Sequence, residues 1–278
     1  CRLPGAPSVE DYWTLLFEGK RGIAPVPFEC WGLHTDFYAG LVDDIYGLDP
    51  KLFMLHPEDL QALDPQAIVL LEESFKAIYH AGYTHQEVGR TNTGVYIGGR
   101  SHGASNSANL AKARNPIMAV GQNYLAANLS HYFNFRGPSL VIDTACSSAL
   151  VCMNTAVEAL QAGTIDTALV GGISLLTSPS THEMFATRSL LPENGQFHIL
   201  DQRASGVVLG EGCGMVYLKP LSKAKQDGDC IYSVIAGISI NNDGRTAGPA
   251  TPNIEAQKAV MRAALKQSGC RQEDIHYL

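Results

Sequence analysis

The chain has 278 residues and a formal net charge of −7, with 45% hydrophobic and 17% charged residues, which is the composition of a globular protein. The net charge is negative and no basic patch stands out, so we expect no nucleic-acid partner. It has neither an apolar run of the roughly 20 residues that span a bilayer nor a signal peptide, so we expect no membrane contact. It begins with Cys-Arg-Leu-Pro-Gly and not with Met, so we expect a piece of a longer protein.

The first helix signal is Ser8, which can cap a helix start, with Asp11 three residues later. Trp13, Leu16 and Phe17 would form the buried face of this helix. Residues 20–50 are irregular, and their aromatic side chains need a surface to pack on. We therefore interpret this segment as part of the domain and not as a linker.

A second, stronger helix signal is Asp64-Pro65, because Asp is a good N-cap and Pro fits the first helical position. Gly82 is a plausible stop. Apolar residues recur on one face between these points: they are Ile68, Leu71, Phe75 and Ile78.

The rest of the chain alternates between strand and helix signals, with a polar excursion at residues 101–115. The predicted strands cover residues 94–98, 139–143, 167–172, 206–218 and 231–240, and the predicted helices cover 123–133, 146–162 and 254–268. The helix over 146–162 is apolar nearly all round and so requires burial on every side. The pattern is mixed α/β, with no repeat and no sharp domain boundary.

The seven cysteines are an odd number without a C-x-x-C pair, so neither a zinc site nor a thioredoxin-like motif is supported. We expect most of them to be small buried residues in a reducing cytoplasm. The exception is Cys146. The seven are Cys1, Cys30, Cys146, Cys152, Cys213, Cys230 and Cys270.

Cys146 lies in Asp143-Thr-Ala-Cys146-Ser-Ser, between a predicted strand and a predicted helix. We expect Asp143 to hold the turn between them through backbone hydrogen bonds. Unpaired backbone N–H groups and the helix dipole at such a junction stabilise a thiolate, the reactive form of cysteine. The dipole supplies only about 0.3–1 kcal/mol, up to ~2 when partly buried, so a base or a second dipole should assist. The same N–H groups can form an oxyanion hole. From the residues alone, a buried structural cysteine is the stronger alternative.

Residues 143–150 resemble the active-site signature of β-ketoacyl synthase (ketosynthase) domains in modular type I polyketide synthases. Other segments follow in the order of that family: residues 1–6, Leu63-Asp-Pro-Gln66, Arg136-Gly-Pro-Ser139, Gly210-Glu-Gly-Cys-Gly214 and Asn241-Asn-Asp-Gly244. The resemblance covers the whole chain and reverses the preference for a structural cysteine. Departures from the usual pattern leave substrate preference open: these are Ala67, Leu200, Ser205 and residues 246–249.

The resemblance implies a thiolase-like layered α/β/α/β/α fold with two related halves. Residues 1–278 would be a partial ketosynthase domain, mostly the N-terminal half, without the first strand and most of the C-terminal half. The two histidines that the family uses for decarboxylation would lie beyond Leu278, so we expect the isolated chain to be inactive. His182 and His198 are interpreted as solvated or locally hydrogen-bonded instead.

The implied reaction transfers an acyl chain to Cys146 from the phosphopantetheine arm of an acyl carrier protein. A malonyl-type extender thioester is then decarboxylated, and its carbanion attacks the acyl-enzyme. No metal and no bound cofactor are implied, because the carrier protein supplies the phosphopantetheine. A cytoplasmic homodimer is expected. The resemblance suggests support from Thr144, Ala145, Ser147 and Glu211, and a substrate channel lined by Met184, Phe185 and Thr251.

Three alternatives share the fold. A non-elongating ketosynthase would accept and pass on acyl chains without condensing them, and the positions of the catalytic histidines would decide this. A non-catalytic partner or scaffold domain typically lacks the active cysteine, so Cys146 argues against it. A degradative thiolase is disfavoured by the context of Cys146 and by the Asn-Asp-Gly loop.

Overall fold

The computed structural model describes residues 1–103, 107–248 and 251–277. A four-stranded sheet in the order β4-β3-β5-β7 lies at its centre. The strands are β3 (Thr93–Gly98), β4 (Ser139–Ile142), β5 (Thr167–Ser174) and β7 (Gly212–Leu218). β3 runs parallel to β4 and β5, whereas β7 is antiparallel to β5. Every residue of β3 is buried, as expected for a parallel strand covered on both faces.

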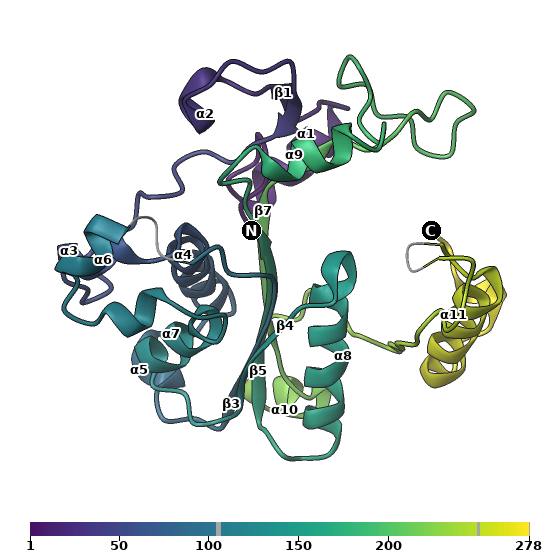
Figure 1. Ribbon diagram of the computed structural model, residues 1–278. Coiled ribbons are helices and arrows are strands. Elements are labelled where there is room, and N and C mark those ends of the chain that lie inside the picture. The colour runs from purple at the N-terminus through teal and green to yellow at the C-terminus, as the bar shows by residue number, and fades with distance from the viewer. Residues whose placement is uncertain (104–106, 249–250, 278) are drawn as a thin grey trace.

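Helices cover the two faces of this sheet (Figure 1). α4 (Pro65–His80) and α7 (Tyr124–Phe133) pack on one face, and the larger core cluster lies there. α8 (Ser148–Gln161) packs on the other face through Cys152 and Ala156, whereas Leu150 on its outer side is 62% exposed. These are three of the five expected layers, and the residues that the structure describes form no second large sheet.

The start of α4 follows the sequence prediction. The Asp64 carboxylate accepts a hydrogen bond from the Gln66 backbone N–H at 2.9 Å, and Pro65 occupies the first turn. Of the predicted apolar face, Ile68, Leu71 and Ile78 are buried and Phe75 is partly buried. The helix ends at His80, two residues before the predicted stop at Gly82.

α1 (Val9–Phe17) confirms one prediction and overturns another. The Ser8 hydroxyl accepts a hydrogen bond from the Asp11 N–H at 3.1 Å, so the predicted cap is present. The predicted burial is wrong, because Trp13 is 69% and Phe17 is 83% exposed. An apolar face of this kind normally marks a contact surface, and no described residue covers it.

Residues 20–50 pack on the body of the protein, as their aromatic content predicts. They contain β1 (Ile23–Pro25), α2 (Phe28–Trp31) and β2 (Tyr38–Gly40), and β2 pairs in parallel with β6 (Leu209–Gly210). Trp31 and Phe37 pack against the small cluster of Val26, Ala39 and Leu176. The Trp31 indole N–H donates to the Leu176 carbonyl at 2.7 Å.

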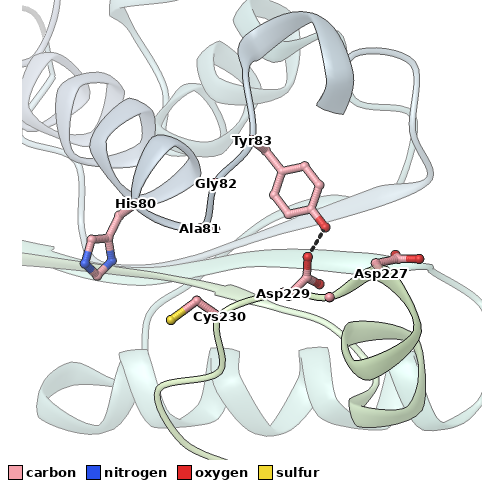
Figure 2. A pocket seen from close by; sticks show the side chains of 8 residues that line it. His80, Ala81, Gly82, Tyr83, Asp227, Asp229 and Cys230 are labelled. Carbon is pink, nitrogen blue, oxygen red and sulfur yellow. Dashed lines mark hydrogen bonds between the residues drawn. The ribbon is translucent and has the colours of Figure 1, made fainter.

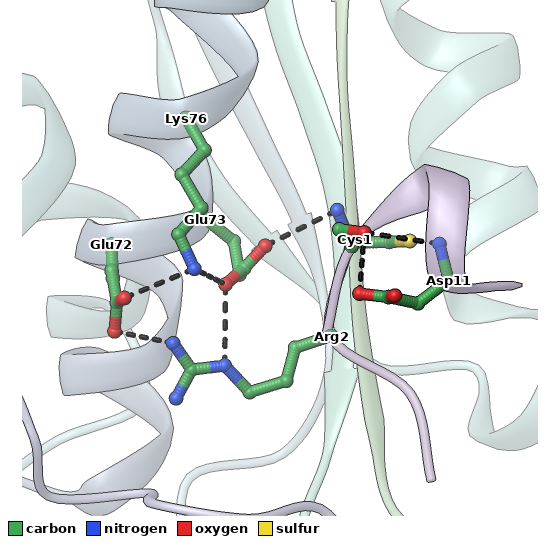
Figure 3. A network of polar contacts seen from close by, with 7 residues as sticks. Cys1, Arg2, Asp11, Glu72, Glu73 and Lys76 are labelled. Carbon is green, nitrogen blue, oxygen red and sulfur yellow. Dashed lines mark hydrogen bonds and ion pairs between the residues drawn. The ribbon is translucent and has the colours of Figure 1, made fainter. Parts of the chain in front are cut away.

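The first residues are tied to α4 by ion pairs (Figure 3). The Arg2 guanidinium reaches Glu72 and, at 3.2 Å, the fully buried carboxylate of Glu73, and Lys76 lies 2.9 Å from the same Glu73 oxygen. A buried carboxylate is costly unless it is paired in this way. The Arg2 backbone also bridges Cys213 in β7, so this segment covers one edge of the sheet.

The remaining helices are short, except for α11. They are α3 (Pro57–Ala62), α5 (His85–Val88), α6 (Ser107–Lys112), α9 (Ser180–Ala186), α10 (Leu221–Asp227) and α11 (Ile254–Ser268), with 3₁₀ turns η1 (Pro116–Ala119), η2 (Ala145–Ser147) and η3 (Gln272–Asp274). α6 lies in the predicted polar excursion, of which residues 104–106 fall outside the described ranges. Within the described ranges, no helix combines the length and the apolar character needed to cross a bilayer.

Two of the predicted strands differ in the structure. The predicted strand 206–218 is divided between β6 and β7, with Glu211 between them. The predicted strand 231–240 is wrong, because this segment forms no strand ladder with any other described segment. A β-strand is defined by its partner's hydrogen bonds, and apolar residues alone do not supply them.

Candidate active site

Cys146 lies on the tight turn that joins β4 to α8. β4 ends at Ile142, the 3₁₀ turn η2 carries Cys146, and α8 begins at Ser148, two residues later than predicted. Ala145, just before the cysteine, has a left-handed backbone with φ of 58°. Cys146 itself is exposed. A sharp strand-to-helix turn of this kind presents its nucleophile outward.

Side chains of the turn occupy two of its backbone N–H groups. The Asp143 carboxylate accepts from the Ala145 N–H at 3.0 Å, which confirms the predicted role of Asp143 in holding the turn. The Ser148 hydroxyl accepts from the Thr144 N–H at 2.9 Å. An oxyanion hole built on this turn must therefore draw on the N–H groups that follow, beginning with Cys146.

Asp143 is also paired with a residue that the sequence reasoning missed. The Arg100 guanidinium Nε lies 2.7 Å from Asp143 Oδ2. The hydrogen bond from the Ala145 N–H and then the Arg100 contact lower the pKa of Asp143 below its usual value. The turn is closed further by Ser147, whose hydroxyl donates to the Thr144 carbonyl at 2.8 Å.

Two glycines set the position of this turn relative to the sheet. Gly98 ends β3, and a Cβ added there would lie 2.5 Å from the Ala149 nitrogen. A Cβ on Gly172 in β5 would lie 2.8 Å from the Ala149 Cβ. The first turn of α8 therefore rests directly on the backbone of two strands, and any larger residue would displace it. Glycines near the ends of two predicted strands are the sequence signal for this contact.

Access distinguishes Cys146 from the cysteines buried in the core. Burial raises the pKa of Cys152 to about 11 and that of Cys213 to about 12. These thiols stay protonated near neutral pH, and the thiolate is the reactive form. Cys30, Cys230 and Cys270 are also exposed, so the prediction that most of the other cysteines are buried is wrong. None of these three is part of the strand-to-helix turn.

Glu211 fastens two loops at the edge of the sheet that carries Cys146. Its carboxylate accepts from the Val42 N–H at 2.9 Å and from the Leu176 N–H at 2.8 Å. Glu211 directly precedes β7, whose first residue pairs with the last residue of β5. Because β5 and β4 run parallel to β3 and end at the same edge, Glu211 and Cys146 share that edge of the sheet.

The predicted channel residues do not come together in the described part of the chain. Met184 and Phe185 lie on α9, where Met184 is 57% exposed. Thr251 is exposed and precedes α11, a helix with no buried residue that stands apart from the sheet (Figure 1). The described residues thus form one wall of the candidate site and not an enclosed pocket around Cys146.

A cavity of about 400 Å³ lies at the opposite end of β7. Its lining includes Tyr83, whose hydroxyl donates to Asp229 at 2.5 Å (Figure 2). Lys219 reaches Asp229 at 2.6 Å and Asp227 at 2.5 Å, so these carboxylates are already neutralised. No group of three His, Cys, Asp or Glu side chains suited to a metal is found among the described residues. The cavity therefore does not compete with Cys146 as a reaction centre.

His198 and His182, the two histidines interpreted from the sequence, lie in different environments. His198 bonds locally to the Gln196 side chain at 3.3 Å, as predicted. The prediction for His182 is wrong: its side chain is fully buried, and it contacts the Tyr38 carbonyl, 144 residues away in sequence. Burial lowers the pKa of His182, with the Tyr38 contact acting in the opposite direction. The polar residues around it in sequence gave no signal of this burial.

Comparisons with known proteins place these features in a family. Residues 1–224 match the family described as Beta-ketoacyl synthase, N-terminal domain, and residues 232–278 match its C-terminal domain. Polyketide synthase PksL of Bacillus subtilis is 55% identical over 278 residues, which are all of this chain and 6% of PksL. Polyketide synthase PksN of the same organism is 34% identical over 99% of the chain, which is 5% of PksN.

Solved ketosynthases share the fold. The ketosynthase from module 6 of the Bacillus subtilis bacillaene synthase matches with a TM-score of 0.89 and 35% identity, over 99% of this chain and 48% of that one. An oxazolomycin ketosynthase domain of Streptomyces albus, OzmH KS8, matches with a TM-score of 0.77 and 42% identity, over 99% and 60%. The predicted thiolase-like α/β fold is thereby confirmed. The chain belongs to the β-ketoacyl synthase family, and within it to the ketosynthases of modular polyketide synthases.

Proposed function

We propose that this chain provides the nucleophilic half of a ketosynthase that extends a polyketide by decarboxylative Claisen condensation. The observation that carries the proposal is the exposed Cys146 on a braced strand-to-helix turn. Its thiolate would attack the thioester carbonyl of an acyl chain held on a carrier protein. A carbon–sulfur bond forms to Cys146, and the phosphopantetheine thiol leaves and takes up a proton.

The second stage needs a carbanion. A malonyl-type extender on the carrier protein loses carbon dioxide, and the resulting carbanion attacks the carbonyl of the acyl-Cys146 thioester. The bond to Cys146 breaks, and the product is a β-ketoacyl thioester on the carrier. Positioned donors must stabilise the carbanion. We expect them to come from the C-terminal domain, beyond residue 278.

The channel and the partners are part of the same proposal. Met184, Phe185 and Thr251 are proposed to line the path of the acyl chain and the pantetheine arm, with Glu211 holding the loops beside it. The acyl carrier protein would bring both substrates, so no cofactor needs to reside in the chain. A cytoplasmic location stays a prediction from the cysteine pattern.

The proposal of a homodimer rests on an edge strand of the central sheet that has no described partner on its outer side. Among the described residues β4 is an edge strand, with β3 on one side only, and its residue Leu140 is 43% exposed. An unprotected edge of this kind invites pairing with another strand. Sedimentation of the chain extended through its C-terminal domain should give a dimer, and a concentration-independent monomer would contradict this part of the proposal.

Acylation of Cys146 is the direct test. The extended chain is incubated with an acyl thioester, and the adduct is mapped by mass spectrometry. Cys146→Ala should abolish labelling, whereas Cys270→Ala, which removes another exposed thiol, should leave it unchanged. Labelling concentrated on any other cysteine would disprove the assignment. Acylation without condensation would identify the non-elongating alternative.

A further inference from the structure

Only one side chain of α9 is buried against the rest of the protein. All seven residues of this helix are described, and His182 is the only buried one. Its side chain is 0% exposed, whereas Met184, two residues later, is 57% exposed. A helix this short gains little stability from its own hydrogen bonds. Its position therefore depends on what His182 contacts.

The His182 ring lies between two aromatic rings of the segment that precedes β2. It stacks on Phe37 at 5.1 Å and 29° between planes, and meets Trp31 at 5.1 Å and 60°. Its Nε2 lies 3.3 Å from the Tyr38 carbonyl oxygen. Because a carbonyl only accepts, Nε2 carries the proton, and Nδ1 is left buried without a partner. The ring is thus held in place by stacking and by one hydrogen bond.

The surface that receives this ring is itself fixed to the edge of the sheet near Cys146. Trp31 donates to the Leu176 carbonyl at 2.7 Å, and the Leu176 N–H donates to Glu211 at 2.8 Å. The loop that follows α9 meets the same segment at Gly195, where an added Cβ would lie 2.4 Å from the Tyr38 ring. Segment 31–38 is therefore a platform that is held to the loop after β5 and that carries α9.

We propose that His182 is a positioning residue that fixes α9 on this platform and so sets where Met184 and Phe185 stand along the acyl chain. The inference rests on the proposed function, in which these two side chains line the channel. Acyl-chain selectivity would then be governed partly by Trp31, Phe37 and His182, none of which touches the substrate.

Histidine suits this place because one flat ring both stacks and donates a hydrogen bond. Phenylalanine at 182 would keep the stacking and lose the donor to the Tyr38 carbonyl. Glutamine would keep a donor and lose the stacking. Alanine would lose both. The three variants therefore separate the two contacts that hold α9.

The test uses the chain extended through its C-terminal domain, with His182→Phe, His182→Gln and His182→Ala, and with His198→Gln as a matched control. Self-acylation at Cys146 is followed with acetyl and with longer acyl thioesters, as kcat and KM. Alkylation of Cys146 by iodoacetamide, a small reagent that needs no channel, is measured in parallel. Hydrogen exchange of the α9 amides gives a readout that does not depend on acylation.

For His182→Ala we expect KM for long acyl chains to rise about tenfold or more, because misplacement by about 1 Å can cost as much as 10²-fold. Acetyl transfer and alkylation should stay within about twofold, and exchange in α9 should accelerate. His198→Gln should change none of these. An equal loss for all acyl lengths, or unchanged α9 exchange, would overturn the inference. If the parent protein does not acylate at Cys146, the proposed function fails, and the exchange data alone still decide whether His182 positions α9.

Discussion

Residues 1–224 and residues 231–277 obey the same local rules and differ in burial. The first region holds three buried clusters, and Ala224 is its last buried residue. No described residue after Ala224 is buried. In the second region α11 still forms, because the Asn253 side chain caps its first turn. The apolar segment 231–240, in contrast, stays unpaired.

The difference shows which elements are locally encoded. A capped helix satisfies its hydrogen bonds within one segment, so α11 needs no neighbour to appear. A strand needs a second chain segment, and burial needs a second layer. The exposed face of α1 and the outer side of α8 lack that layer in the described part of the chain. Segment 231–240 contacts α11 at Gly237 and lacks a described partner strand. The solved relatives are longer, since this chain covers 48% of the bacillaene ketosynthase chain.

The difference in burial between the two regions should disappear when a second layer covers the exposed apolar faces. Extending the chain through its C-terminal domain should convert a weak, broad thermal transition into a cooperative one. Each large apolar side chain newly buried, such as Trp13, Phe17 or Leu150, is worth about 1.5–3 kcal/mol. Net domain stability is only about 5–15 kcal/mol, so a few such residues decide the outcome.

Circular dichroism melting and a condensation assay with carrier-bound substrates are run on both lengths. Condensation should be absent from the 278-residue chain and present in the extended one. A sharp melt and measurable condensation by the short chain would show that its core and site are already complete.

The caps of α4 and α11 should differ next most in their effect on the free energy of unfolding. Asp64 caps α4 inside the core and also accepts from the Ser101 hydroxyl and the His102 N–H. Asp64→Ala should cost about 2–4 kcal/mol, from the lost cap and the buried donors left without an acceptor. Asn253→Ala at the start of α11 should reduce helix content and leave the main unfolding midpoint unchanged. Equal shifts of the midpoint by the two variants, in urea, would argue that both regions share one core.

The contact between α8 and the sheet is tested by a pair of glycines. Gly98→Ala should destabilise by about 1–3 kcal/mol through overpacking and should slow alkylation of Cys146 as the turn moves. Gly214→Ala in β7 is the matched control, because an added Cβ there meets no atom within 4 Å. Similar effects of both substitutions, on the urea midpoint and on the alkylation rate, would mean that the Gly98 contact does not position the nucleophile.

The smallest expected effect is a pH dependence at His182. Its pKa is lowered in the folded protein because burial disfavours the charged ring. The unfolded chain therefore binds a proton near pH 6.5, where the folded protein does not. The free energy of unfolding should fall as pH drops below about 6.5, and the fall should end below the folded-state pKa. His182→Phe should lose this component and His198→Gln should keep it. Parallel pH curves for the parent and His182→Phe would contradict the assignment.

Most of the fold follows from local signals in the sequence. Ser8 and Asp64 start their helices as capping chemistry predicts, and β3 and β5 follow from short buried runs. The inferences that failed each depended on a distant partner. Trp13 was predicted to be buried because it is apolar, and segment 231–240 to be a strand for the same reason. Neither property is decided within the segment itself.

The residues of the candidate site also fall into those predicted from a local motif and those placed by distant contacts. Cys146 and the role of Asp143 in its turn follow from eight consecutive residues. Arg100 was missed because it lies 43 residues from Asp143, and His182 was missed because its partners lie in segment 31–38. Pairings at such separations leave no period or motif in one sequence.

Ala145 has a consequence for how this turn can vary among relatives. A non-glycine residue in the left-handed region stores strain, of order 1–3 kcal/mol, and such strain gathers at functional sites. Glycine would relieve this strain but would also raise the conformational entropy of the unfolded chain, which lowers stability. A β-branched residue would both strain the backbone and crowd the approach to Cys146. Substitution at position 145 should therefore be confined to glycine and to small unbranched residues wherever the cysteine is retained. A Val or Ile at this position would mark lineages in which the nucleophile has lost its use.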